Sequence, residues 1–260
     1  MKFSGVQMTL VAIGLLAACS NPPATLNGTV VDHWGNPIEG ATVIMEGQSE
    51  RPLTDADGRY SFNLVPGKHT MRAGKNGFIQ MVSDLEVKDG ETPTGPVFKL
   101  HKKPEEPGYY LIGTHEYVKL ASQPVKSIGN DLKSHRGLKS VGEALAEHDL
   151  QILFHTDLKY DQILRLGLEL HKLKFVKEDQ LPGSEQSKEL VELNLYASDS
   201  EIPIEIEPIH SREDYLITPK ESLSPGYYAF QTQDLLDSDN AETFSQIPAE
   251  LRKVYSFEYR

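Results

Sequence analysis

Two stretches of the chain come close to metal-binding patterns, and the first is His210-Ser211-Arg212-Glu213. It has the His-x-x-Glu spacing of a zinc-hydrolase ligand pair, but such a site needs a third histidine well downstream, and no histidine follows His210. The chain has no His-Glu-x-x-His stretch, and its single cysteine cannot supply the paired thiolates of a structural zinc site. We therefore predict that residues 210–213 are an exposed loop.

The second stretch, Asp55-Ala56-Asp57-Gly58, begins like a calcium-binding loop. An EF-hand loop needs a Glu eleven residues after its first Asp, and Pro66 stands at that position. The side chains of Asp55 and Asp57 are better suited to accept hydrogen bonds from backbone N–H groups within a turn. The sequence thus predicts no metal ion and no cofactor.

Histidine and aspartate also occur together as His148/Asp149 and His155/Asp157, at the two ends of an expected strand. A histidine oriented by a carboxylate is the arrangement that general-base catalysis uses. The chain has no Gly-x-Ser-x-Gly elbow, no Ser-x-x-Lys and no phosphate-binding glycine loop. A hydrolase with a site near residues 148–157 is therefore the alternative hypothesis, while the lack of a complete catalytic set favours a protein that is not an enzyme.

The one thiol of the chain, Cys19, follows a short apolar run. Lys2, the apolar stretch 6–16 and two alanines form the pattern of a secretory signal peptide. The run is shorter than the ~18–20 residues of a membrane-spanning helix. Leu16-Ala17-Ala18-Cys19 resembles the lipobox of bacterial lipoproteins, and this resemblance implies a diacylglyceryl thioether on Cys19 and an acylated amine.

This resemblance predicts where the protein is located. Residues 1–18 are expected to be the signal peptide and residues 19–25 a lipidated tether. Each buried CH₂ group contributes ~0.8 kcal/mol, so two or more acyl chains would hold the protein on a membrane. Ser20 stands where the inner-membrane retention signal has Asp, which favours the outer membrane of a Gram-negative bacterium. The body would lie in the periplasm or at the cell surface.

Charge and composition narrow the class of partner. Charged residues make up 25% and hydrophobic residues 38% of the chain, as in ordinary globular proteins. The formal net charge of −12 argues against nucleic acid as a partner, because nucleic-acid binding needs a basic surface.

From Leu26 the sequence alternates between apolar and polar residues, with turn residues at short intervals. The alternating stretches are 26–30, 41–45, 60–64 and 69–73, and the turns between them are rich in Asp, Asn, Gly and Pro. Short strands at this spacing predict a β-sandwich. Gly35 and Gly58 would supply positive φ in tight turns, and Pro37 presets φ directly after the first turn.

Several of these stretches carry a family resemblance. They are Gly28-Thr29-Val30-Val31-Asp32, Gly35-Asn36-Pro37-Ile38-Glu39-Gly40-Ala41-Thr42-Val43, Thr54-Asp55-Ala56-Asp57-Gly58-Arg59-Tyr60-Ser61-Phe62 and Pro66-Gly67. Together they resemble the carboxypeptidase regulatory-like domain. The resemblance covers residues 26–101 and implies a prealbumin-like (transthyretin-like) fold. Because this module is attached to many different proteins, the resemblance specifies no activity.

Trp34, the only tryptophan, lies in the first of these turns. An indole at the tip of a sandwich could stack on a sugar or contact a protein partner. The alternative is a ring folded back over the edge of its own sandwich.

Residues 102–108 are charged and contain two prolines, which indicates a linker, and residues 109–260 would form a second domain. Alternation predicts strands over 109–120, 149–155, 161–176, 191–195, 202–206 and 255–259, with a bulge before Leu173. Pro203 favours an edge position. The stretches 215–219 and 223–230 are expected to pair as a hairpin, and 137–148 to form a short helix. The fold class is therefore mainly β, with one or two short helices at most.

These observations predict an envelope lipoprotein that is held on a membrane through Cys19 and acts as a non-catalytic binding or structural module. Its partner would be a protein or a glycan. The alternative is a periplasmic or surface hydrolase.

Overall fold

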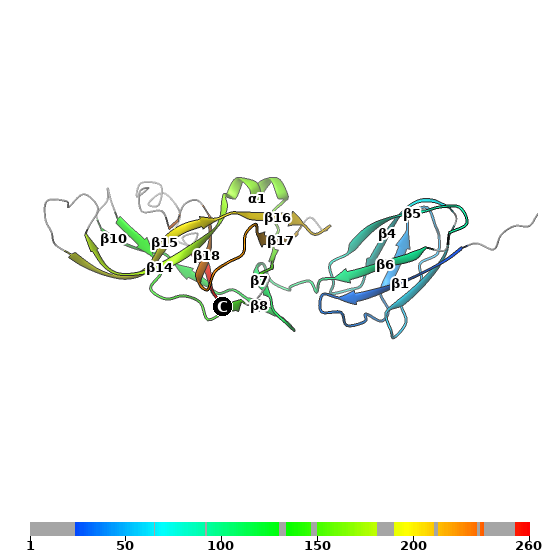
Figure 1. Ribbon diagram of the computed structural model, residues 1–260, viewed down its shortest axis with the longest axis horizontal. Coiled ribbons are helices and arrows are strands. Elements are labelled where there is room, and N and C mark those ends of the chain that lie inside the picture. Colours follow the sequence, from blue (N-terminus) through cyan, green and yellow to red (C-terminus); the bar gives the residue numbers. More distant parts are fainter. Residues whose placement is uncertain are drawn as a thin grey trace, which may run out of the picture.

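The computed structural model describes residues 24–64, 66–91, 93–129, 134–146, 150–180, 190–210, 213–232, 235–236 and 253–260. The predicted signal peptide, Cys19, and the pair His148/Asp149 lie outside these residues. Figure 1 shows two lobes, one containing strands β1 to β6 and the other containing all later elements. Within the described part of the chain, no helix is long and apolar enough to cross a membrane.

The first lobe is a sandwich of two three-stranded sheets. One sheet has the order β3-β1-β6 and the other β2-β4-β5. Strand β1 pairs antiparallel with β3 and parallel with β6. The strands are β1 (Ala24–Asp32), β2 (Thr42–Met45), β3 (Arg59–Leu64), β4 (Gly67–Gly74), β5 (Met81–Val87) and β6 (Thr94–Leu100).

The core of this sandwich is formed by the residues whose alternation predicted the strands. The residues that are buried between the sheets alternate along the strands, and they include Leu26 and Val30 of β1, Val43 of β2 and Phe62 of β3. Gly28 is required between them, because a Cβ atom there would overlap the ring and hydroxyl of Tyr60. The prediction of a β-sandwich is confirmed.

Two turns of the first sandwich are closed by an aspartate that caps its own backbone. Asp32 Oδ1 accepts from the backbone N–H groups of Trp34 and Asn36, at 2.9 and 2.8 Å. Asp55 Oδ1 accepts in the same way from Asp57 and Arg59, at 3.0 and 2.7 Å. Each carboxylate therefore uses one oxygen to satisfy two N–H groups of a turn.

The glycines of these turns have positive φ. Gly35 has φ +90° and Gly58 has φ +73°. At Gly58 a Cβ would also overlap the carbonyl oxygen of Val30, whereas at Gly35 it would meet nothing within 4 Å. Pro37 forms an isolated bridge with Val31, which closes the first turn against β1.

The second lobe is also a sandwich, with five strands in one sheet and six in the other. The orders are β16-β17-β13-β7-β8 and β12-β19-β18-β14-β15, and β9 pairs with β19. A separate hairpin, β10-β11, lies beside β15. The elements are β7 (Gly108–Ile112), β8 (Tyr117–Lys119), β9 (Ser122–Pro124), β10 (Lys126–Gly129), β11 (Ser134–Gly137), β12 (Leu145–Ala146), β13 (Ile152–His155), α1 (Tyr160–Leu166), β14 (Leu168–Gln180), β15 (Leu190–Ile202), β16 (Ile204–Pro208), β17 (Asp214–Pro219), β18 (Gly226–Thr232) and β19 (Lys253–Tyr259).

Aromatic rings dominate the core of this second sandwich. Tyr109 of β7 stacks on Phe154 of β13 with ring centroids 4.3 Å apart, and on Phe230 of β18 at 5.4 Å. Aliphatic side chains from both sheets complete the core. The expectation of a mainly β second domain is confirmed, with α1 as the one helix among the described residues.

Three local expectations for the second domain are wrong. Residues 137–148 form no helix where they are described, because Leu138 exchanges two backbone hydrogen bonds of 2.9 Å with Tyr196 and residues 145–146 pair with β19. Residues 160–166 are helical rather than extended, and Gly167 ends the helix with φ +59°. The stretches 215–219 and 223–230 do not pair, because β17 and β18 belong to different sheets.

Two other expectations describe the structure well. The pairing of β14 with β15 shifts between Lys172 and Leu173, and the extra residue, Asp199, is on β15. Pro203 separates β15 from β16, and β16 is an edge strand of the other sheet.

Candidate functional site

The two sandwiches meet through an apolar contact. Ile79, which precedes β5, packs with Leu153 of β13 and Ile209, and all three are buried. Partly buried residues around them belong to both sandwiches: Met81, Tyr110, Ile112, Tyr117 and Leu216. The second sandwich presents to this contact the face of its β13–β17 sheet that is opposite to its own core. The residues of this contact, together with Trp34, the His33–His101 pair, the His155–Asp214 pair and the Lys103–Glu213 pair that lie beside it, are here called the junction.

Trp34 is part of the junction. Its indole N–H donates to the carbonyl of Gly113 at 2.8 Å, and its ring centroid lies 5.2 Å from that of Tyr117. The ring is half-buried and lies against the second sandwich, rather than over the edge of its own. Contact of Trp34 with an outside partner stays a prediction.

Two imidazoles lie beside this tryptophan. The ring centroids of His33 and His101 are 4.8 Å apart, and His101 Nδ1 is 3.2 Å from the Tyr117 hydroxyl. Burial, with smaller contributions from His33 and Lys99, lowers the pKa of His101 to about 4. Burial also lowers the pKa of His33. Both rings are therefore neutral at pH 7, and protonation would place two like charges side by side.

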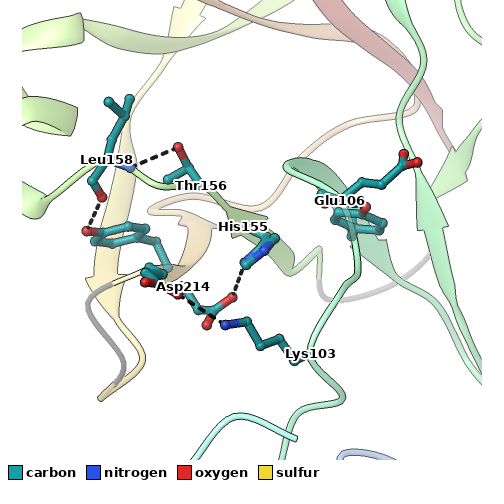
Figure 2. Close-up of polar contacts among 9 residues, drawn as sticks. Lys103, Glu106, His155, Thr156, Leu158 and Asp214 are labelled. Atoms are coloured by element: carbon teal, nitrogen blue, oxygen red, sulfur yellow. Dashed lines mark hydrogen bonds and ion pairs between the residues drawn. The ribbon is translucent and has the colours of Figure 1, made fainter. Parts of the chain in front are cut away.

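A buried histidine–aspartate pair extends the junction (Figure 2). His155 Nδ1 of β13 is 2.8 Å from Asp214 Oδ1 of β17, and both side chains are almost completely buried. Beside them, Lys103 of the linker donates to Glu213 at 3.1 Å. The alternative hypothesis paired His155 with Asp157, but Asp157 is exposed. The partner of His155 is its cross-strand neighbour, 59 residues away in sequence.

A groove of about 870 Å³ opens at the junction. Its apolar lining comes from both sandwiches: Met81 and Val82 of β5, and Pro208, Ile209, Tyr215 and Leu216 from the segment containing β16 and β17. Polar side chains at the groove are His101, Lys159, Asp161, Glu207 and His210. An apolar groove with a few polar groups is the usual form of a ligand site.

One aromatic ring of the groove is open to solvent. Tyr160, the first residue of α1, keeps 42% of its surface exposed. Its ring lies nearly parallel to that of Tyr215, at 18° and 6.1 Å between centroids. No sequence signal identified Tyr160, because residues 161–176 were expected to form a strand.

His210 and Glu213 of the His-x-x-Glu stretch belong to no metal site among the described residues. His210 lies at the groove, while Glu213 is bound by Lys103. Across the described segments, no three His, Cys, Asp or Glu side chains are arranged to hold a metal ion.

A second polar cluster lies on the outer face of the β14–β18 sheet. His171 Nδ1 is 2.7 Å from Ser198 Oγ, and His171 Nε2 is 2.9 Å from Glu169 Oε2. Gln231 Nε2 donates to the same Glu169 oxygen at 2.7 Å, and Gln231 Oε1 accepts from the backbone N–H of Leu236 at 2.7 Å. The Ser198 hydroxyl, the His171 imidazole and the Glu169 carboxylate thus form a chain of hydrogen bonds. No motif in the sequence indicated these residues.

The sequence comparisons with known proteins each cover a part of the chain. Residues 25–101 match the sequence profile of the carboxypeptidase regulatory-like domain. A TonB-dependent receptor, P39 of Formosa agariphila, is 44% identical over 48 residues, which are 18% of this chain and 5% of that receptor. The chain therefore covers a small part of that relative.

Among solved structures, BcpA, the major pilin subunit of Bacillus cereus, aligns with 91% of this chain and 67% of its own. The sequence identity is 12% and the TM-score 0.24, which is too low to support an inference. Residues 25–101 of this chain form a carboxypeptidase regulatory-like domain, joined to a second sandwich that the profile does not cover.

Proposed function

We propose that this chain is a lipid-anchored protein of the bacterial cell envelope that binds a ligand in the groove between its two sandwiches and does not convert it. The lipobox-like stretch Leu16-Ala17-Ala18-Cys19 supports the anchor. The stretch of similarity to a TonB-dependent receptor supports a place in the envelope.

The observation that carries the proposal is that residues of both sandwiches line the groove. Met81 and Val82 come from the first sandwich, and Ile209 and Leu216 from the second. The two walls are held together by the hydrogen bond from Trp34 to Gly113 and by the contact of its ring with Tyr117. A ligand in the groove would contact both domains, which gives the regulatory-like domain a role in binding.

Site-specific photocrosslinking tests the groove. A benzoylphenylalanine at Val82, inside the groove, is expected to capture a component of the envelope in intact cells. The matched control is Val97 on β6, which is 65% exposed and lies outside the groove. Equal capture from both positions, or capture from neither, would contradict ligand binding in the groove.

The anchor is tested separately. Metabolic labelling with a palmitate analogue is expected to label the wild type and to fail for Cys19→Ala, which is also expected to leave the membrane fraction. Ser20→Ala is the control and should be labelled like the wild type. An unlabelled wild type would exclude lipidation.

The cluster around His171 favours a second candidate function, hydrolysis of an ester by a serine nucleophile. In the tautomer whose Nε2–H donates to Glu169, His171 Nδ1 is an acceptor for the Ser198 hydroxyl proton. This tautomer requires the Gln231 amide nitrogen, 2.8 Å from His171 Nε2, to turn its N–H away from the ring. Ser198 Oγ would bond to the ester carbonyl carbon as its proton moves to His171. The leaving alkoxide would take that proton, and water would then hydrolyse the acyl-serine in the same way.

Labelling with a fluorophosphonate probe tests this candidate. The expected result is one adduct that disappears in Ser198→Ala and persists in Ser200→Ala, an exposed serine of the same strand. Absence of the adduct in the wild type would dismiss the serine hydrolase.

A further inference from the structure

We infer that the groove at the junction binds an uncharged oligosaccharide, with Tyr160 as the ring on which a sugar stacks. This inference rests on the proposed function, because it names the ligand class of the same groove. Three features carry it: an exposed ring with a rigid support, a balanced set of charges, and a strand edge that offers few free backbone groups to a peptide.

The exposed ring is Tyr160. Its neighbour Tyr215 is fully buried and donates its hydroxyl to the carbonyl of Leu158 at 2.9 Å, so the ring behind Tyr160 is fixed. The C–H faces of a pyranose are apolar while its hydroxyls remain polar, and an aromatic ring offers a flat apolar surface of matching size. A ring that is supported on one side and 42% exposed is suited to stacking of this kind.

The polar groups of the groove match a ligand with hydroxyls and no net charge. Asp161 and Glu207 are acceptors, and Lys159 is a donor. Arg165, which is not among the lining residues, pairs with Asp161. When Arg165 is included, two carboxylates are balanced by two cations, and burial keeps His101 neutral at pH 7. This set offers both donors and acceptors to sugar hydroxyls without favouring an anion or a cation.

The edge strand β16 offers few free backbone groups to an extended peptide at the groove. Ile209 N–H donates to Asp214 at 2.8 Å and Lys220 N–H donates to Pro203 at 2.9 Å. Because bonded positions alternate in an antiparallel ladder, the outer edge of β16 carries the backbone groups of residues 204, 206 and 208.

Two of these three residues each have one backbone group that cannot bond freely to an added strand. Pro208 has no N–H, and the Ile206 carbonyl faces the Tyr160 hydroxyl at 3.5 Å. A second copy of this chain is also disfavoured. Two β16 strands side by side would bring the exposed Glu205 and Glu207 of each copy close to those of the other.

Isothermal titration of the mature protein with a panel of hexasaccharides tests the inference. The uncharged probes are cellohexaose, laminarihexaose, xylohexaose, mannohexaose and maltohexaose. Hexagalacturonate and a hexalysine peptide represent the charged ligands. We expect binding of at least one uncharged hexasaccharide and no binding of the two charged probes.

Variants then locate the bound sugar. Tyr160→Ala is expected to weaken binding about tenfold or more, and Tyr160→Phe to retain it, because the ring is kept. Phe175→Ala is the matched control, since Phe175 is an aromatic residue of β14 that is 55% exposed and lies outside the groove. Circular dichroism checks that each variant is folded.

The outcomes separate this inference from the proposed function. No binding of any uncharged hexasaccharide, or equal weakening by Tyr160→Ala and Phe175→Ala, would overturn the inference. Binding of hexagalacturonate that is lost in Tyr160→Ala would overturn the claim that the ligand is uncharged, and such binding of hexalysine would overturn the sugar class; either result would keep the groove as a ligand site. Failure of crosslinking at Val82 would instead count against the proposed function itself.

Discussion

The two sandwiches differ in how their sequences specify them. In the first, the turns are closed by their own residues, as with Asp32 and Asp55, which accept backbone hydrogen bonds within four residues. In the second, the central strand β13 has only four residues and lies between β7 and β17, from distant parts of the chain. Local turn chemistry can be recognised in a sequence, whereas pairing between distant strands leaves little local trace.

The largest expected effect on stability comes from removing one buried phenylalanine ring from the core of one sandwich at a time. Phe62→Ala in the first sandwich and Phe257→Ala in the second should each lower the free energy of unfolding of their own domain by about 3–5 kcal/mol. Differential scanning calorimetry measures this as a shift of one transition. If both variants shift all of the unfolding together, the junction makes the two sandwiches one cooperative unit.

Acidification is expected to have the next largest effect, and to act at the junction. The pKa of His101 is lowered to about 4 by burial, so between pH 6.5 and pH 4 the unfolded state binds more protons than the folded state. Stability is therefore fully present above pH 6.5 and lost as the pH falls toward 4, by up to about 3 kcal/mol.

Urea titrations at pH 7.5, 5.5 and 4.5 measure this loss, and His101→Gln should reduce it. If the variant loses stability with falling pH as steeply as the wild type, another group is responsible.

Substituting two turn glycines of the first sandwich separates the energetic cost of positive φ from that of a steric overlap. Gly58→Ala should destabilise by about 2 kcal/mol, because φ is positive and the new Cβ would overlap the Val30 carbonyl. Gly35→Ala should lose about 1 kcal/mol, since it adds strain in φ without an overlap. Thermal melts of both variants provide the measurement, and equal losses would show that the overlap has no energetic weight.

The smallest effect is expected at the contact between the sandwiches. Trp34→Phe keeps an aromatic ring and removes the N–H that Gly113 accepts, at a cost of about 1 kcal/mol. The intrinsic fluorescence of Trp34, the only tryptophan, reports unfolding in the wild type, so circular dichroism must be used for the variant. A stability equal to that of the wild type would mean that water replaces the indole at Gly113 without cost.

Much of the fold was predictable from alternation and turn residues, while most of the site was not. The stretches 26–30 and 60–64 alternate because one face of each strand meets a core. The stretch 164–171 alternates as well, but residues 164–166 belong to a helix that buries Ile163 and leaves Leu164 exposed, so in that part the alternation does not mark a strand.

The residues of the site come together only through tertiary pairing. His155 meets Asp214 because β13 and β17 pair, and Trp34 meets Gly113 because the sandwiches pack together. Neither contact follows from spacing along the chain. The sequence singled out three of these residues: Trp34 as the only tryptophan, His210 in the His-x-x-Glu stretch, and His155, which it paired with Asp157 instead of Asp214.

Pro203 marks the place where one uninterrupted run of backbone, β15 followed by β16, leaves one layer of the second sandwich and enters the other. The two layers are consequently tied by covalent bonds at the start of β16, while the groove lies at its other end, around Pro208. A force on β16, for example from a large ligand bound to a membrane-anchored protein, would be transmitted along the main chain into β15 and the opposite layer.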